Sequence, residues 1–322
     1  MPRLTRIEDV MFPVEEHPVF VNVRTKSGER HLPVPDKKAI VNAKNDRVLG
    51  VVSRGYRLVT NSEALDWAYQ CCCIVFPGTK PGEWDVQASD APGSGGHCFI
   101  DLAHNSGVLD FALVQAKNRP DAFGPFIRVT NSYNGLRALA FDIGFYRKVC
   151  KNGMILRESI ISFKFNHMQR EIGQKIGFAV DSKKLSKLTA SFKDYFVGLQ
   201  ECTVPRAYFE PLLCGVLLIN KPKEMKHPNR NIAEDWRFLN HHLGALCDRY
   251  FMELGDNAYA AFNAMTDFAS HPPANRCVHR DRNSFQRLAG TWLSNFSKEC
   301  KQTDFDILAY LKKIAIENAK IN

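Results

Sequence analysis

Histidine and cysteine are the residues of this sequence whose chemistry would be easiest to recognise, because they are the usual protein ligands of zinc. The best-placed sets are His241 and His242 with Cys247, and His271 with Cys277 and His279. Neither set has the spacing of a structural zinc site, and adjacent residues of a helix point about 100° apart. We therefore expect solvated or core histidines, and the sequence predicts no metal and no other cofactor.

No familiar catalytic motif occurs along the chain. The patterns GxSxG, HExxH and Walker A are missing, as is the dinucleotide fingerprint. The glycines of segment 77–96 could form a phosphate cradle, but they lie among Pro-Gly pairs typical of turns and lack the GxxxxGK[ST] pattern. Carboxylate pairs such as Glu15 and Glu16 cannot be placed across a cleft from sequence. We predict that the protein is not an enzyme, with an unrecognised active site as the remaining alternative.

Basic side chains provide a stronger signal. The formal net charge is +9, which favours an anionic partner such as nucleic acid. Eleven lysines and arginines fall between Phe145 and Lys193, where Glu158, Glu171 and Asp181 are the acidic residues that oppose them. A second basic set, which includes Arg280 and Arg282, follows the break at residues 271–273.

Aromatic residues are interleaved with these charges, and aromatic rings stack on unpaired bases while lysine and arginine follow the phosphates. The alternative is an ordinary solvated helix face for the lysines and core positions for the aromatic residues Phe163 and Phe165. The predicted nucleic-acid-binding residues are Arg147, Lys148, Lys151, Lys183, Lys184, Lys187, Arg280 and Arg282.

The elements that would position these residues change character along the chain. Strand patterns occur at 17–25, 39–43, 48–53, 56–59, 84–88, 97–103, 108–115, 126–131, 136–145 and 160–165, and a helix capped by Asn61 or Ser62 is inserted among them. Helical periodicity follows at 185–199, 205–219, 232–253, 257–269, 284–296 and 305–319. Strands first and helices second predict an α+β fold, with a β-rich domain at 1–166 and a helical domain at 167–322 packed closely on it.

The cellular compartment follows from apolar runs and cysteines. No run approaches the 18 apolar residues of a membrane span, and the first residues lack the apolar stretch of a signal peptide. We expect a protein of the host cell cytoplasm with reduced thiols. The adjacent Cys71, Cys72 and Cys73 lie in an apolar helix and are best explained as small buried hydrophobic residues, with a redox or metal role as the alternative.

Several segments together resemble a known family. They are residues 48–53 (VLGVVS), 56–61 (YRLVTN), 130–135 (TNSYNG), 146–154 (YRKVCKNGM) and 263–268 (NAMTDF) with His271. In this order they resemble the phage/plasmid-like domain-of-unknown-function family 932. The resemblance implies a product of phages, prophages or plasmids, and it implies no catalytic residue that can be carried over to this chain.

Two functions of different classes are compatible with these observations. The first is a DNA-handling protein of a mobile element, of the single-strand binding or annealing type, which uses the basic residues directly. The second is a phage counter-defence inhibitor that oligomerises and blocks a host anti-phage nuclease complex by protein-protein binding. In both cases we predict a homo-oligomer, because the helical half is apolar on several faces, including residues 209–219.

Overall fold

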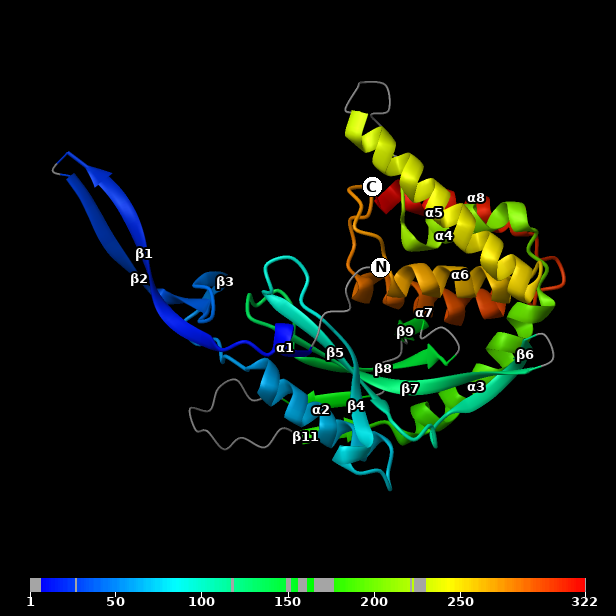
Figure 1. Cartoon of the computed structure of the whole chain (residues 1–322), viewed down its shortest axis with the longest axis horizontal. Coiled ribbons are helices and arrows are strands. Elements are labelled where there is room, and N and C mark those ends of the chain that lie inside the picture. The colour runs from blue at the N-terminus through cyan, green and yellow to red at the C-terminus, as the bar shows by residue number, and fades with distance from the viewer. Residues whose placement is uncertain are drawn as a thin grey trace.

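The computed structural model describes residues 7–26, 28–116, 119–148, 152–155, 161–164, 177–220, 222 and 230–321. Antiparallel sheets make up the N-terminal half, one long helix is inserted between them, and the C-terminal half is helical (Figure 1). The predicted α+β fold is confirmed.

The largest sheet has six antiparallel strands in the order β4-β5-β7-β8-β9, with β6 paired to β7. The strands are β4 (Trp84–Asp90), β5 (His97–His104), β6 (Phe111–Ala116), β7 (Arg119–Ser132), β8 (Ala140–Arg147) and β9 (Asn152–Ile155). A separate hairpin joins β10 (Ile161–Lys164) to β11 (Gly177–Val180). The strand predicted at 56–59 is not formed.

The two faces of the large sheet differ because side chains alternate along each strand. Ile100, Val129 and Phe141 lie side by side on β5, β7 and β8 and form an apolar face. The next row on the opposite face is charged and consists of Asp101 and Arg128 with their neighbour Asp142. One face of the sheet is therefore packed by hydrophobic contact, and the other carries charges that need partners.

Helices α2 (Asn61–Val75) and α3 (Ser182–Glu201) pack against the apolar face. Thr60 caps α2 and forms a capping box with Glu63, so the cap precedes the expected Asn61 or Ser62. Asp181 caps α3 by accepting a hydrogen bond from the amide of Lys184. A tilted ring contact between Phe145 of β8 and Phe192 of α3, with centroids 4.5 Å apart, joins the sheet to this helix.

The remaining helices lie on the charged face of the sheet (Figure 1). They are α4 (Phe209–Leu217), α5 (Arg230–Leu254), α6 (Ala258–Ser270), α7 (Arg282–Glu299) and α8 (Ile307–Ile321), with short turns η1 (Pro81–Glu83) and η2 (Arg206–Tyr208) elsewhere and α1 (Ile7–Val10) at the start. Every residue of α6 is buried. Gly290 of α7 lets the helix approach β9 closely, because a Cβ there would lie 2.0 Å from the carbonyl oxygen of Ile155.

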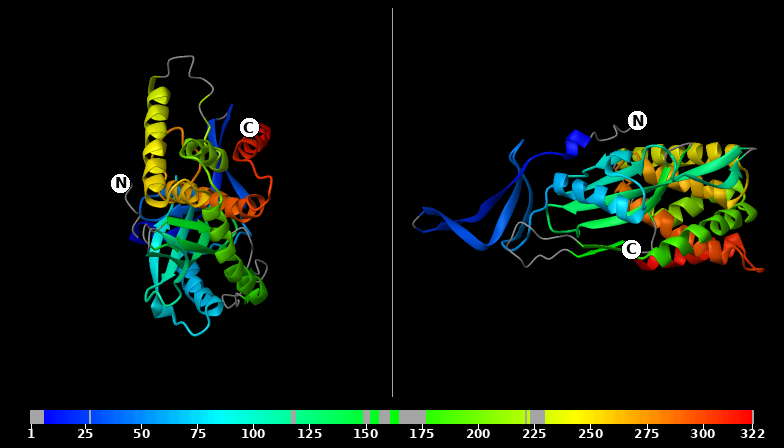
Figure 2. Two further views of the ribbon diagram at one scale, coloured as in Figure 1. Left: turned by 90° about the vertical axis from the view of Figure 1, so that its right-hand side faces the viewer. Right: turned by 90° about the horizontal axis from the view of Figure 1, so that it is seen from below.

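The first three strands form a long arm that projects from the rest of the molecule (Figures 1 and 2). They are β1 (Val14–Thr25), β2 (Gly28–Asn42) and β3 (Arg47–Ser53), in the order β1-β2-β3. The expected turn between the strands at 39–43 and 48–53 is present, with Asp46 at φ 57°. At its base the sheet packs Ile40, Leu49 and Val52 around the buried Tyr133.

One hydrophobic core runs through both halves of the chain. It contains Phe123 and Phe145 from the sheet together with Phe196, Phe262 and Trp292 from the helices. The predicted boundary between residues 166 and 167 lies outside the described residues. No helix in the described part of the chain is both long and apolar enough to span a bilayer.

Candidate functional site

Asp101 is the centre of a buried ion-pair network between the sheet and α7. The guanidinium of Arg128 donates to both carboxylate oxygens of Asp101 at 2.5 Å, and Arg282 donates to Oδ2 at 2.7 Å. The hydroxyl of Tyr146 donates to the same oxygen. Burial alone would raise the pKa of Asp101, but the charge and hydrogen bonds of Arg128 outweigh it and lower the pKa.

Arg147 lies in a second buried network. Its guanidinium pairs with Asp121 at 2.7 Å and with Glu253 of α5 at 2.8 Å, and its side chain is 2% exposed. Tyr259 of α6 donates its hydroxyl to Asp121 at 2.6 Å. The side chain of Arg147 is therefore not available to phosphates in this fold, contrary to the expectation from sequence. Its guanidinium joins the consecutive strands β7 and β8 to α5, with Glu253 lying 106 residues after Arg147.

The other predicted site residues are divided among different surroundings. Arg282 is used by Asp101, as described above, and Arg280 donates to the carbonyl of Leu218 at 3.2 Å. Lys148 is exposed at the end of β8 and pairs with Asp110 at 2.9 Å. Lys151 lies outside the described residues. Arg280, Arg282 and Lys148, the described members of this set, thus have separate partners.

Three of the predicted residues lie together at the start of α3. Lys183, Lys184 and Lys187 are exposed in the first turns of α3. Lys184 lies 3.4 Å from the carboxylate of its helix cap Asp181. Lys183 and Lys187 are four residues apart, so they lie on one face of the helix.

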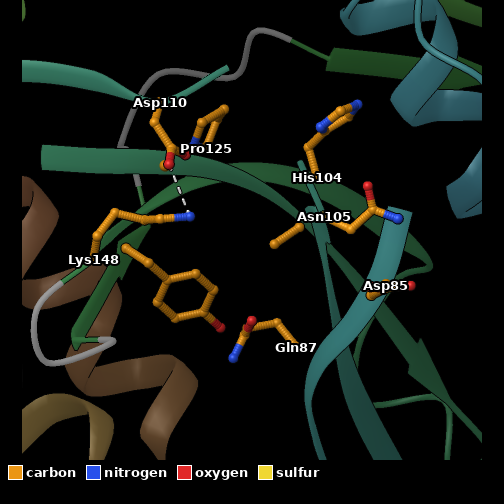
Figure 3. A pocket seen from close by; sticks show the side chains of 10 residues that line it. Asp85, Gln87, His104, Asn105, Asp110, Pro125 and Lys148 are labelled. Carbon is orange, nitrogen blue, oxygen red and sulfur yellow. Dashed lines mark ion pairs between the residues drawn. The ribbon is translucent and has the colours of Figure 1, made fainter. Parts of the chain in front are cut away.

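A pocket of about 280 Å³ opens beside the sheet, near the end of β8 (Figure 3). It is lined by Asp85, Gln87, Ala103, His104, Asn105, Asp110, Gly124, Pro125, Tyr146 and Lys148. Lys148 is held by Asp110, and Tyr146 donates its proton to Asp101. Lys148, Asp110 and Tyr146 are therefore engaged in contacts within the fold.

Thiols and histidines behave as ordinary side chains of the fold. Cys71 and Cys72 are fully buried, as expected for small hydrophobic residues, whereas Cys73 is only half-buried. Burial raises the pKa of Cys71 to about 12. Nδ1 of His271 lies 3.0 Å from a carboxylate oxygen of Asp267. Within the described ranges, no three His, Cys, Asp or Glu side chains are grouped so that they could hold a metal ion.

The arm carries exposed apolar side chains that lie outside the predicted basic residues. Its exposed apolar side chains are Phe20, Val21, Val23, Leu32, Val48 and Val51. Phe20 is 54% exposed and Val21 is 51% exposed. Exposed apolar side chains gathered on one element are typical of an interaction surface. In the sequence, the alternation of valine and polar residues at 17–25 indicates a strand. It does not show whether another element covers that strand.

Comparison with known proteins identifies one relationship. Residues 48–292 match the family described as Domain of unknown function (DUF932). The chain belongs to this family. No curated protein and no solved structure matches the chain. Within the DUF932 match lie both buried networks and the first turns of α3, whereas β1 and β2 of the arm precede it.

Proposed function

We propose that this DUF932 chain is a non-catalytic binding protein that handles DNA and contacts single strands through the N-terminal turns of α3. The observation that carries the proposal is the exposure of Lys183, Lys184 and Lys187 on a helix whose other side is held in the core by Phe192 and Phe196. The helix presents these charges on a rigid support. The net charge of +9 favours the same class of partner.

The proposed contact is electrostatic and has little sequence preference. Asp181 occupies the N-terminus of α3 by accepting from the amide of Lys184 at 3.0 Å. Phosphates would therefore meet the lysine ammonium groups rather than the free amides at the helix end. A lysine ammonium is a point charge on a flexible stem, which neutralises phosphates without reading bases.

The salt dependence of DNA binding tests this proposal. Each phosphate contact on a single strand contributes about −0.7 to the slope of log K against log salt. The double variant Lys183→Glu with Lys187→Glu should weaken binding and flatten the slope by roughly 1 to 1.5. A matched control is Lys298→Glu with Lys312→Glu, which changes the net charge equally at exposed positions of α7 and α8. Equal binding by the α3 variant and the parent at every salt concentration would contradict the proposal.

A second candidate function is inhibition of a host anti-phage nuclease complex by protein-protein binding. The observation that favours it is the outer face of α5, where Phe238 is 61% exposed and Met252 is 70% exposed. The two residues are fourteen positions apart, which is close to four full turns, so they lie on one side of the helix. Ala245, between them, is also exposed. Such a face is suited to a protein partner.

Affinity purification from an infected host separates the two functions. The tagged protein is isolated with and without nuclease, beside the variant Phe238→Asp with Met252→Asp. A stoichiometric host protein that survives nuclease and is lost with the α5 variant would select the inhibitor function. Recovery of host proteins only when nucleic acid is intact would select DNA handling.

A further inference from the structure

Two cysteines lie at the ends of two helices that are distant in the chain. Cys202 follows the last residue of α3, and Cys300 follows the last residue of α7. The two helices pack against each other, although α3 covers the apolar face of the large sheet and α7 lies on its charged face. A covalent bond between these cysteines would therefore join the two layers that enclose the sheet.

The backbone of Gly198 brings the two cysteines together. Its carbonyl oxygen accepts the amide of Cys202 at 3.1 Å and the thiol of Cys300 at 3.8 Å. A Cβ at Gly198 would lie 2.8 Å from Cε of Lys301, so this side of α3 faces the turn that follows α7. Residues four positions apart share one side of a helix, so the side chain of Cys202 faces the same turn.

The backbone at both cysteines lies just outside regular helix. At Cys202 it is extended, with φ −84° and ψ 108°, and Cys300 begins the turn at residues 300–304. Small changes in these angles can move the two Sγ atoms to the length of a disulfide bond, about 2 Å, without unwinding either helix.

The two thiols differ in their access to solvent and in their acidity. Cys202 is buried in the core, whereas Cys300 is half-buried. Unlike the pKa of the buried Cys71, the pKa of Cys300 is lowered, first by a hydrogen bond with the thiol of Cys202 and then by the charge of Lys301, which together outweigh burial. The same hydrogen bond and burial raise the pKa of Cys202. An acidic thiol that reaches solvent beside a second cysteine is typical of a site of reversible oxidation.

We propose that Cys202 and Cys300 form a peroxide-sensitive pair that is oxidised to an intramolecular disulfide. The thiolate of Cys300 attacks one oxygen of hydrogen peroxide, the O–O bond breaks, and Cys300 becomes a sulfenic acid. The hydroxide that leaves takes up the proton that Cys300 had lost. Sγ of Cys202 then attacks the sulfenic sulfur, and the thiol proton of Cys202 leaves with the hydroxyl group as water. Two thiols are oxidised, and one peroxide is reduced to two molecules of water.

The pair is a modification site that is separate from the proposed DNA contact. Lys183 and Lys187 lie in the first turns of α3, at the opposite end of the helix from Cys202. In a reducing compartment the two thiols are the favoured state, so the disulfide forms only when peroxide is present. The oxidised protein differs from the reduced one by a bond between the ends of α3 and α7.

Oxidation of the reduced full-length protein with hydrogen peroxide tests the proposal, followed by digestion without reductant and mass spectrometry. The parent should lose the mass of two hydrogen atoms and yield one cross-linked pair of peptides that contains Cys202 and Cys300. In Cys202→Ser the reaction should stop at the sulfenic acid of Cys300, which dimedone traps. In Cys300→Ser the buried Cys202 should remain reduced, because it reacts with the sulfenic acid and not with peroxide.

Cys214 provides the matched control. It is also half-buried, but burial raises its pKa to about 11, so Cys214→Ser should form the same disulfide as the parent. Circular dichroism checks that each variant folds, and Cys202→Ala serves in place of the serine variant if that one does not. DNA binding by the cysteine variants should equal that of the parent, which keeps failure of this proposal distinguishable from failure of the DNA contact. A sulfenic acid that persists on Cys300 of the parent, or a disulfide that joins two chains or other cysteines, would overturn the proposal.

Discussion

The guanidinium of Arg147 at the end of β8 forms an ion pair of 2.8 Å with the carboxylate of Glu253 on α5, a residue 106 positions later. The same guanidinium also pairs with Asp121 of β7. A charge that is almost fully buried is held by partners from both halves of the chain. The sheet and the helical layer are thus joined by charge as well as by their common hydrophobic core.

Replacement of Arg147 should destabilise the whole protein. In Arg147→Met the apolar stem is kept, but Asp121 loses its cationic partner in the interior, and removal of one partner of a buried pair costs about 3–5 kcal/mol. Chemical denaturation followed by circular dichroism measures the change. The neighbouring exposed pair provides the control, since Lys148→Ala should cost at most about 1 kcal/mol. Equal effects of the two substitutions would contradict the burial described for Arg147.

Gly290 should not tolerate a side chain. The Cβ of Gly290→Ala would lie 2.0 Å from the carbonyl oxygen of Ile155, so α7 and β9 would have to separate. Overpacking of this kind typically costs about 1–3 kcal/mol. Thermal unfolding of the variant should show a lower midpoint, whereas Gly82→Ala, which has open space around its Cβ, should be close to the parent.

Asp281 should make the stability of the fold depend on pH in the acid range. Burial alone would raise its pKa, but the nearby His97, whose Nε2 lies 3.8 Å from Oδ2, the hydrogen bond from Ser284 and the charge of Arg137 outweigh it and hold the pKa well below 3.8. A carboxylate whose pKa is lower in the folded than in the unfolded protein stabilises the fold at pH values above its unfolded pKa. This stabilisation is lost as the pH falls towards the pKa of the folded protein. The midpoint of Asp281→Asn should be lower than that of the parent at neutral pH.

The two midpoints should begin to converge as the pH falls below about 4, because the aspartate of the unfolded parent then becomes protonated, and they should meet only below the lowered pKa of the folded parent. Thermal unfolding at several pH values measures this. Asp194→Asn, an exposed substitution with the same change of charge, serves as the control. A constant difference between parent and Asp281→Asn at all pH values would show that the carboxylate charge is not responsible.

The cysteines should differ in reactivity within one helix. Burial raises the pKa of Cys71 and of Cys98 to about 12, and alkylating reagents attack the thiolate. The half-buried Cys73 should therefore be modified before its neighbour Cys71 in the native protein. Iodoacetamide labelling followed by peptide fragmentation shows the order, and labelling in denaturant should remove the difference. Early modification of Cys71 would mean that α2 opens readily.

Metal chelators should leave the fold unchanged. The candidate ligands are dispersed, with His241 exposed on α5 and Cys277 buried beyond α6. A protein that depends on structural zinc unfolds when the metal is removed. The thermal midpoint should therefore be the same with and without chelator. Stoichiometric zinc by elemental analysis, together with a lower midpoint in chelator, would contradict this expectation.

Local patterns were sufficient for the class of fold and for most helices. Helical periodicity depends on residues three and four positions apart, so the helix expected at 232–253 appears as α5 at Arg230–Leu254. Strand alternation at 17–25 likewise located β1. The partner β2 was expected only from residue 39, because its outer part contains Pro33, Pro35 and several charges that resemble a loop.

What each charged side chain does was decided by the tertiary structure. Arg147 and Lys148 are adjacent and equally basic in sequence, yet one is buried against Asp121 and Glu253 while the other is exposed. Alternation sends neighbouring side chains of β8 to opposite sides, and the carboxylates that receive Arg147 come from distant segments. By itself the sequence determined the α+β order of elements, the helical periods and the positive charge. Which cations face solvent depends on contacts such as those of Arg147 with Asp121, 26 residues away, and with Glu253, 106 residues away, and local spacing in the sequence does not reveal them.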